Sequence, residues 1–186
     1  MTAESPSADV SVRVGWTADA PGIAALQVAS WREQLAGVVP DEALDELDEA
    51  QFTATWHASL SRPEDARNRV LVALERNSLR GFAVTTPSPD PDSDPIADGE
   101  VAELVVAAGH RGSGHGSRLL QACVDTLRAD RFVRATCWVV SSDDARRRFL
   151  AEAGWAPDGA HRELDLTGDG TTRLRQVRLH TDLRED

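Results

Sequence analysis

Lysine and tyrosine are both missing from this chain of 186 residues. Without lysine, all 20 basic residues are arginines, and a phosphate-binding loop of the Gly-Lys-Ser/Thr type is excluded because that loop needs its lysine. Without tyrosine, one common proton donor of active sites is lost. Asparagine and isoleucine are scarce as well, which is typical of a G+C-rich genome and favours a bacterial source.

Cysteines and long apolar runs are also few. Cys123 and Cys137 are the only cysteines, and they lack the CxxC spacing of a zinc or redox site, so we expect two reduced core residues. No run of about 18 apolar residues occurs, and the polar, acidic start at Met1–Asp9 does not resemble a secretory signal. These absences predict no membrane span and a cytoplasmic protein.

Basic residues are fewer than acidic ones: the chain has 20 basic and 31 acidic residues, which gives a formal net charge of −11. A nucleic-acid-binding protein normally presents a basic face to the phosphate backbone. The composition therefore argues against a nucleic-acid partner and favours cationic ones.

The hydrophobic content of 41% is enough for one domain with a sizeable core. We expect a disordered tail over residues 1–9, a single domain over 10–183, and a mobile Pro/Asp-rich loop over 87–98. Hydrophobic periodicity predicts the remaining elements. Strands are expected at 10–14, 70–75, 79–85, 100–107, 133–140, 161–166 and 174–179, and helices at 17–35, 41–60, 115–129 and 143–153.

This order of elements predicts a mixed α/β (α+β) domain. Its core would be a mixed sheet of about seven strands flanked by about four helices. The two strands near the C-terminus form a hairpin whose outer edge could pair with a second copy, so a homodimer is an open possibility.

The segment Arg111-Gly-Ser-Gly-His-Gly116 carries the clearest functional signal. Its glycines permit positive φ and a close approach of backbone to a ligand. The segment precedes a predicted helix, whose unpaired N–H groups and partial positive charge favour an anion such as pyrophosphate. A flexible turn that merely starts a helix is the alternative.

A dinucleotide-binding turn fits the segment poorly. In the GxGxxG register that starts at Gly112, the third glycine position holds Ser117. Val139 and Val140 stand where the ribose-binding acid of such a fold would be expected. The dinucleotide reading is therefore disfavoured.

The same residues resemble the Gcn5-related N-acetyltransferase (GNAT) family, whose pyrophosphate turn reads Arg/Gln-x-x-Gly-x-Gly/Ala. Arg111, Gly114 and Gly116 match this pattern. The segments that share the family's spacing are Leu104-Val-Val106 upstream, Ala145 to Phe149 and Gly154-Trp155 downstream, and Ser30-Trp-Arg32 with Gly37-Val-Val-Pro40 in the first half.

The resemblance implies a GNAT-like, mostly antiparallel sheet that splays between its fourth and fifth strands, and acetyl-CoA as the cofactor. It implies transfer of an acetyl group to a primary amine on a small molecule or peptide, by direct attack in a ternary complex. The backbone of Val105 and Val106 would pair with the pantetheine arm. The pyrophosphate would be held by the turn residues Arg111, Gly112, Ser113, Gly114, His115, Gly116 and Ser117.

The resemblance also indicates candidate catalytic groups. An attacking ammonium must lose a proton, and Glu103 stands where many relatives carry a carboxylate, with Glu100 as a nearby reserve. The tyrosine that often protonates the leaving thiolate is replaced by Leu150, and Ser142 stands where relatives often have an asparagine. A CoA-binding regulatory module that has lost turnover is therefore the alternative function.

No histidine pair shows the HxH, HxxxH or HExxH spacing of a metal site, so no metal is predicted. His110 and His115 flank the glycine turn and are expected at the surface, with phosphate contact as the less favoured role. The acids that begin the second predicted helix, from Asp41 to Glu49, fit either a solvated helix start or a pocket for a cationic acceptor.

Overall fold

Seven strands form one sheet in the order β1-β2-β3-β4-β5-β7-β6. The computed structural model describes residues 10–184, so the expected tail over residues 1–9 lies outside the described residues. All neighbouring strands are antiparallel except β4 and β5. The strands are β1 (Val10–Val14), β2 (Arg69–Glu75), β3 (Ser78–Pro87), β4 (Asp98–Val106), β5 (Arg134–Val140), β6 (Ala156–Asp165) and β7 (Arg173–Asp182). The predicted mixed, mostly antiparallel sheet is confirmed.

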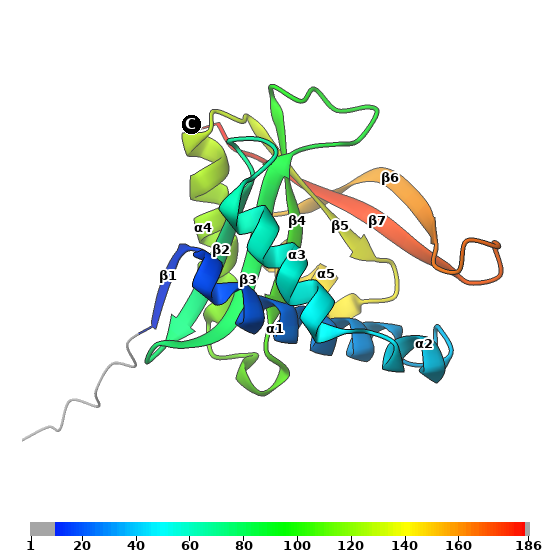
Figure 1. The fold of residues 1–186 in the computed structure, drawn as a ribbon. Coiled ribbons are helices and arrows are strands. Elements are labelled where there is room, and N and C mark those ends of the chain that lie inside the picture. The colour runs from blue at the N-terminus through cyan, green and yellow to red at the C-terminus, as the bar shows by residue number, and fades with distance from the viewer. Residues whose placement is uncertain (1–9, 185–186) are drawn as a thin grey trace, which may run out of the picture.

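Helices cover both faces of this sheet (Figure 1). They are α1 (Ala20–Leu35), α2 (Asp41–Asp45), α3 (Glu49–Ser61), α4 (His115–Ala129) and α5 (Asp144–Glu152), with short 3-10 turns η1 (Thr17–Asp19) and η2 (Ala108–His110). On one face, Ile23 of α1 and Trp56 of α3 pack against Phe82 of β3. On the other face, Leu119 of α4 and Leu150 of α5 belong to the main hydrophobic core.

Two element boundaries differ from the sequence prediction. The single helix predicted over 41–60 is wrong: the chain forms α2, leaves the helix, and restarts as α3. The restart has a local cause, because the Asp48 side chain accepts a hydrogen bond from the Ala50 N–H at 2.8 Å and caps the new helix. Strand β6 begins at Ala156, earlier than predicted, because its first residues pair with β7 before an irregularity interrupts the ladder.

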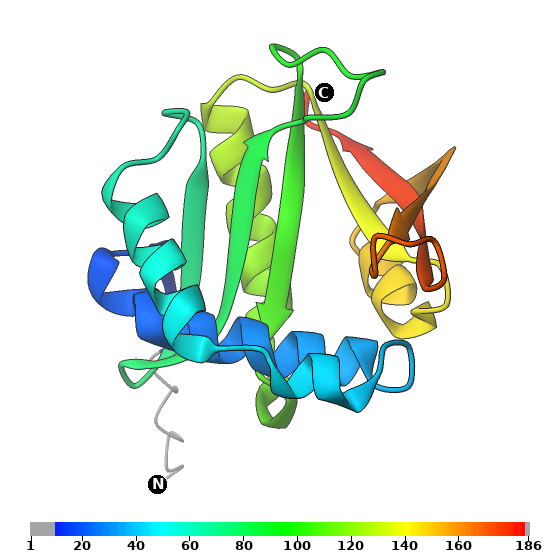
Figure 2. The same cartoon turned by 45° about the vertical axis from the view of Figure 1, so that its right-hand side comes forward.

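The β4–β5 pair provides the opening in which a ligand can bind. These strands are paired only over Asp98–Glu100 and Arg134–Thr136, and then diverge (Figure 2). A bulge contributes to this divergence, because Val84 lies opposite Glu103 while the next residue, Thr85, lies opposite Val101, so that one residue of β4 is left over. The expected splay between the fourth and fifth strands is confirmed.

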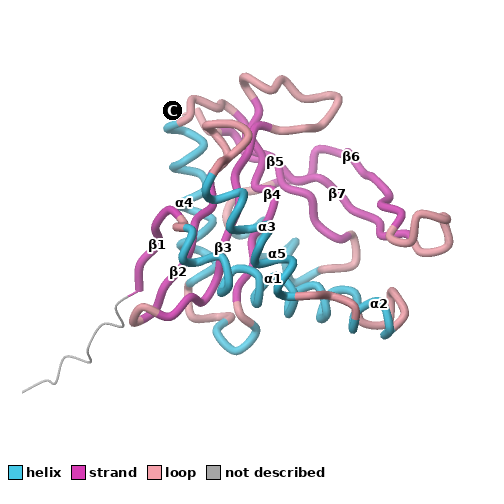
Figure 3. The backbone as a smooth tube through the Cα atoms, viewed as in Figure 1, coloured by secondary structure: helices cyan, strands magenta, loops and turns pink. Residues whose placement is uncertain are grey.

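The β3–β4 loop and the β6–β7 turn project from the body of the domain (Figure 3). The Arg178 side chain, only 5% exposed, holds the β3–β4 loop through Asp90 at 3.0 Å and Asp92 at 2.6 Å. The Trp138 indole N–H donates to Asp90 as well, at 3.0 Å. These contacts tie the loop to β5 and β7, and its mobility stays a prediction.

Candidate active site

A cavity of about 830 Å³ lies where β4 and β5 diverge. The end of β4 forms one wall, and the end of β5 with the start of α5 forms the opposite wall. The start of α4 and part of α1 close the remaining sides. The lining residues predicted from the sequence are Val105, Val106, Arg111, Gly112, Gly114, Gly116, Ser117 and Ser142; the others are Ser30, Glu33, Gln34, Leu104, Val140, Asp143, Ala145, Arg146 and Phe149.

The glycine turn meets this cavity in a conformation that other residues adopt poorly. Gly112 has φ +78° and Gly114 has φ +82°, both in the left-handed region. A Cβ atom added to Gly112 would lie more than 4 Å from every described residue other than its two chain neighbours, so the turn leaves open space beside its backbone. Gly114 caps α4, and no side chain of residues 10–184 caps that end. The first N–H groups of the helix are therefore free to bind an anion.

Arg111 lies beside the turn but already has an acidic partner. Its two terminal nitrogens contact the two carboxylate oxygens of Glu33, from α1, at 2.7 and 2.6 Å. Both side chains are about half exposed and both line the cavity. The Arg111 guanidinium lowers the pKa of the Glu33 carboxyl, so this pair is ionised at neutral pH.

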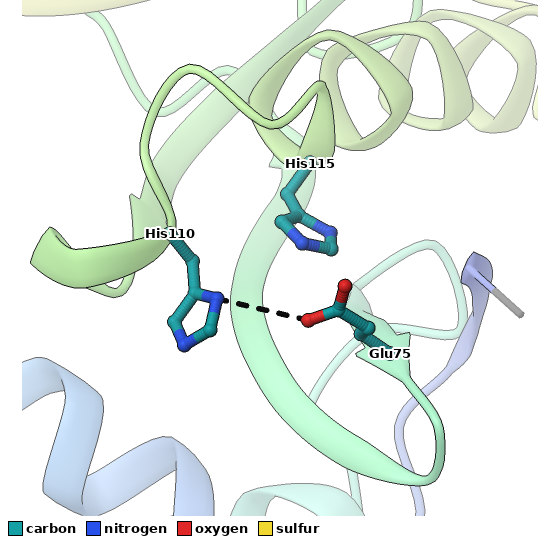
Figure 4. A group of neighbouring side chains, drawn as sticks. All are labelled: Glu75, His110 and His115. Carbon is teal, nitrogen blue, oxygen red and sulfur yellow. Dashed lines mark ion pairs between the residues drawn. The ribbon is translucent and has the colours of Figure 1, made fainter. Parts of the chain in front are cut away.

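Two residues of the glycine turn lie away from the cavity. Neither Ser113 nor His115 lines the cavity. His115 is 1% exposed, so the expectation of a surface histidine is wrong; its ring points toward Glu75 and His110 (Figure 4). His115 is the first residue of α4, and its ring faces Glu75 and His110 instead of the cavity. Its backbone N–H still belongs to the turn.

Glu103 belongs to a hydrogen-bond chain that begins on the helices above β4. The Trp56 indole N–H of α3 donates to Gln27 Oε1 of α1 at 2.8 Å, and Gln27 Nε2 donates to Glu103 at 3.0 Å. Burial raises the pKa of the Glu103 carboxyl, and the Arg146 charge and the Gln27 hydrogen bond oppose that rise. Hydrogen bonds from Gln27 and Trp31 orient the carboxylate, and both lower its pKa.

Glu100 has a smaller solvent-exposed fraction than Glu103. It is 6% exposed, and its Oε2 has no hydrogen-bond partner among the described residues. Burial, with a smaller contribution from the Asp90 charge, raises the pKa of Glu100 to about 7, against the opposing effect of Arg162 and Arg178. Glu100 lies where β4 and β5 are still paired, and neither it nor Glu103 lines the cavity itself.

The β5–α5 connection provides the opposite wall. Ser142 and Phe149 line the cavity, whereas Leu150, at the expected tyrosine position, is 2% exposed and packs in the main core. The Asp143 side chain caps α5 by accepting a hydrogen bond from the Arg146 N–H at 2.9 Å. This cap places the Arg146 backbone beside the cavity.

Several contributors were not identified from the sequence, namely Glu33, Gln27 as a partner of Glu103, and Arg146. For α1 the signal was present, because Gln27 and Ser30 share the helical spacing of its apolar residues. Polar residues on an apolar face need partners, and such residues are candidates for a site.

Comparison with known proteins agrees with this geometry. The profile of the acetyltransferase (GNAT) family matches residues 29–155. A phosphinothricin N-acetyltransferase of Streptomyces coelicolor is 31% identical over 105 residues, which span 56% of this chain and 61% of that relative's length.

Solved structures share the fold at low identity. One from Salmonella typhimurium, described as an acetyltransferase with its cofactor acetyl-CoA, has a TM-score of 0.71 and 19% identity, covering 96% of both chains. The PaiA N-acetyltransferase of Thermoplasma acidophilum in complex with coenzyme A has a TM-score of 0.65 and 14% identity, covering 94% of this chain and 99% of that one. With the family profile matching well over half of its length, this chain belongs to the GNAT family of acetyltransferases.

Proposed function

We propose that this protein transfers an acetyl group from acetyl-CoA to a primary amine. The observation that carries the proposal is the cavity between β4 and β5, which joins an anion-binding helix start to a strand edge free of its neighbour. These are the two features that a coenzyme A phosphate group and a pantetheine arm need. The match to the family supports the same conclusion.

The residues of the cavity fit this cofactor from end to end. The N–H groups after Gly114 and the Arg111 side chain bind the pyrophosphate, and the open space beside Gly112 lets phosphate oxygens approach the backbone. Val105 and Val106 lie on the part of β4 that has no β5 partner. Successive residues of a strand direct their backbone groups to opposite sides, and the neighbouring Ala107 N–H bonds Arg80 of β3, so the Val106 backbone groups face the open edge and hydrogen-bond the amides of the pantetheine arm. Acetyl-CoA supplies an activated acetyl thioester.

Glu103 acts as the proton acceptor in this proposal. An acceptor amine with a pKa near 10 is an ammonium at neutral pH, and it attacks only after losing a proton. Glu103 takes that proton directly or through a water molecule, held in place by Gln27. The amine nitrogen then bonds the acetyl carbon while the carbon–sulfur bond breaks. Glu100, with a pKa of about 7, is the reserve acceptor.

The leaving thiolate has weaker assistance. Leu150 is buried in the core and offers no proton, and Ser142 is the hydroxyl that lines the cavity at the equivalent wall. A thiol with a pKa near 8.5 leaves tolerably at neutral pH, so transfer proceeds without a dedicated acid at a reduced rate. The buried Leu150 also favours a second candidate, a CoA-binding module without turnover, and thioester cleavage with any amine would exclude that candidate.

The acceptor is proposed to be a small-molecule or peptide amine, in a cytoplasmic setting. Among residues 10–184, no helix has the length and apolar character to cross a membrane. The acids of α2 are exposed, which keeps open the cationic-acceptor hypothesis. Strand β6 forms the outer edge of the sheet and is the proposed site of homodimer pairing.

Cofactor binding is tested by calorimetric titration with acetyl-CoA, using two variants with the same backbone strain. Gly112→Trp fills the open space beside the cavity. Gly168, in the β6–β7 turn, has the same φ of +78°, and a Cβ added there also lies more than 4 Å from the described residues beyond its chain neighbours, so Gly168→Trp is the matched control. Wild type and Gly168→Trp should bind and Gly112→Trp should not. Equal binding by all three proteins, or none by wild type, contradicts the proposed site.

Catalysis is tested by thiol release with a panel of primary amines. Glu103→Gln keeps the contact with Gln27 but cannot accept a proton, so kcat should fall about 10²–10⁴-fold while the acetyl-CoA affinity stays within a factor of two or so. Glu64→Gln, an exposed carboxylate before β2, is the control. An unchanged kcat and pH profile in Glu103→Gln would contradict Glu103 as the proton acceptor and leave Glu100 as the candidate.

A further inference from the structure

Behind the glycine turn, three potential metal ligands come together from separate elements. Glu75 ends β2, His110 ends η2 and His115 begins α4. One ligand atom from each lies within 4.8 Å of the others, and the side chains point toward one another (Figure 4). The His110 Nδ1 atom is 3.7 Å from a Glu75 carboxylate oxygen, and the two imidazole rings are 6.2 Å apart.

The buried His115 ring has two nitrogen atoms whose hydrogen-bonding capacity is not satisfied within residues 10–184. It is 1% exposed, and neither Nδ1 nor Nε2 has a hydrogen-bond partner among the described residues. A buried polar group without a partner destabilises the fold, and a neutral imidazole has both a donor and an acceptor to satisfy.

The donor set matches a transition metal. Two imidazoles and one carboxylate are ligands that Zn²⁺ takes at about 2.0–2.2 Å, which places them roughly 3.3 Å apart. The observed separations are up to 4.8 Å, so the three side chains must move closer together to hold an ion. Glu75 and His110 are partly exposed, at 26% and 33%, so an ion can enter and water can complete the coordination.

Among residues 10–184, Arg80 is the arginine that forms an ion pair with this carboxylate. Its Nε lies 3.3 Å from Glu75 Oε2, the same oxygen that faces His110. The other carboxylate oxygen is left for a metal. The Arg80 charge therefore lowers the affinity for a metal ion by repulsion, but the Arg80 side chain does not occupy the metal position.

We propose that Glu75, His110 and His115 bind one Zn²⁺ ion and thereby fasten the pyrophosphate turn to the β2–β3 hairpin. The two histidines immediately flank Arg111–Gly114, so one ion anchors both ends of that turn. The metal site is set by its own three side chains and does not depend on acetyl transfer. Its link to the turn rests on the proposed cofactor site.

The test is calorimetric titration of chelator-stripped full-length protein with ZnCl₂, without coenzyme. Wild type should bind one equivalent saturably, and His110→Ala should weaken binding by at least about 100-fold, as should Glu75→Gln. His57→Ala and His161→Ala, which remove exposed histidines on α3 and β6, are matched controls and should leave binding unchanged. Arg80→Gln should tighten it.

His115→Leu addresses the buried ligand directly. Because it deletes two unpaired ring nitrogens, this variant should fold at least as stably as wild type in urea and still lose the ion. No saturable binding by wild type, equal binding in His110→Ala and Glu75→Gln, or an equal loss in His57→Ala each overturns the proposal.

The link to the turn is measured separately, as acetyl-CoA affinity with and without one equivalent of Zn²⁺. A several-fold tightening that His110→Ala abolishes supports the link, and unchanged affinity refutes it. Zn²⁺ binding by a protein that binds no acetyl-CoA would leave the metal site standing and reject the proposed function.

Discussion

Glu33 and Arg111 form an ion pair inside the proposed cofactor cavity, and this pair should restrain coenzyme A binding. The Arg111 side chain is the only formal positive charge in the glycine segment from 111 to 116, and its guanidinium is bound by both oxygens of Glu33. A pyrophosphate therefore meets an arginine that is already paired, next to a carboxylate that repels it. Replacing Glu33 with Gln should tighten coenzyme A binding.

The magnitude follows from the exposure of the pair. The side chains are 51% and 50% exposed, and exposed ion pairs contribute about 0.2–1 kcal/mol. Releasing Arg111 should therefore lower the Kd for coenzyme A by about 1.5- to 5-fold. Charge-assisted hydrogen bonds from Arg111 to pyrophosphate contribute about 2 kcal/mol to the binding free energy. Breaking the ion pair with Glu33 offsets about 0.5 kcal/mol of that contribution. Arg111→Ala should accordingly raise the Kd about tenfold.

The assay is calorimetric titration with coenzyme A at low and high salt, on wild type, both single variants and the double variant. The benefit of Glu33→Gln should shrink in the Arg111→Ala background, because there is no guanidinium to release. It should also shrink at high salt, since the pair is exposed. Weaker binding by Glu33→Gln would refute the reasoning and show that Glu33 positions Arg111 instead of competing for it.

Three further predictions concern stability. Glu100→Gln should stabilise the protein at pH 8 and not at pH 5. Burial raises the pKa of Glu100 to about 7 in the folded state, above its value in the unfolded chain. The folded protein therefore loses stability as pH rises through this range and Glu100 ionises, and a glutamine avoids that loss. Urea unfolding at both pH values measures this, and equal shifts would contradict it. Arg178→Met should cost about 3–5 kcal/mol by removing the buried ion partner that Asp90 and Asp158 share, although Trp138 and Arg162 still contact Asp90. The same change should speed proteolysis in the β3–β4 loop, and an unchanged cleavage rate would mean that other contacts hold the loop. Gly116→Ala should raise Tm by about 2–4 °C, because alanine has a higher helix propensity than glycine. The added Cβ would lie 3.5 Å from Phe149, which is an ordinary contact. A lower Tm would indicate hidden strain.

Local chemistry was sufficient for much of the fold and for one end of the site. The strand, glycine turn and helix over 98–129 depend on alternation, on residues that tolerate positive φ, and on helical spacing, all of which are written within a few neighbouring residues. The strand and helix positions beyond them followed in the same way, except where Asp48 restarts a helix inside a periodic pattern and where β6 begins early, at Ala156. The β4–β5 splay came only from the family resemblance, because a bulge and an unpaired strand edge leave no periodic signal.

Tertiary structure decided which side chains meet. Gln27 and Glu103 are 76 residues apart, and Glu33 and Arg111 are 78 apart, so no local spacing could pair them. The same holds for Glu75 with His110 and His115, whose separations match no metal-site motif. The sequence determines which segments become strands, turns and helices, since those depend on neighbouring residues. The sheet order and the helix crossings determine which distant side chains share a site, because contact depends on where the folded backbone carries each residue.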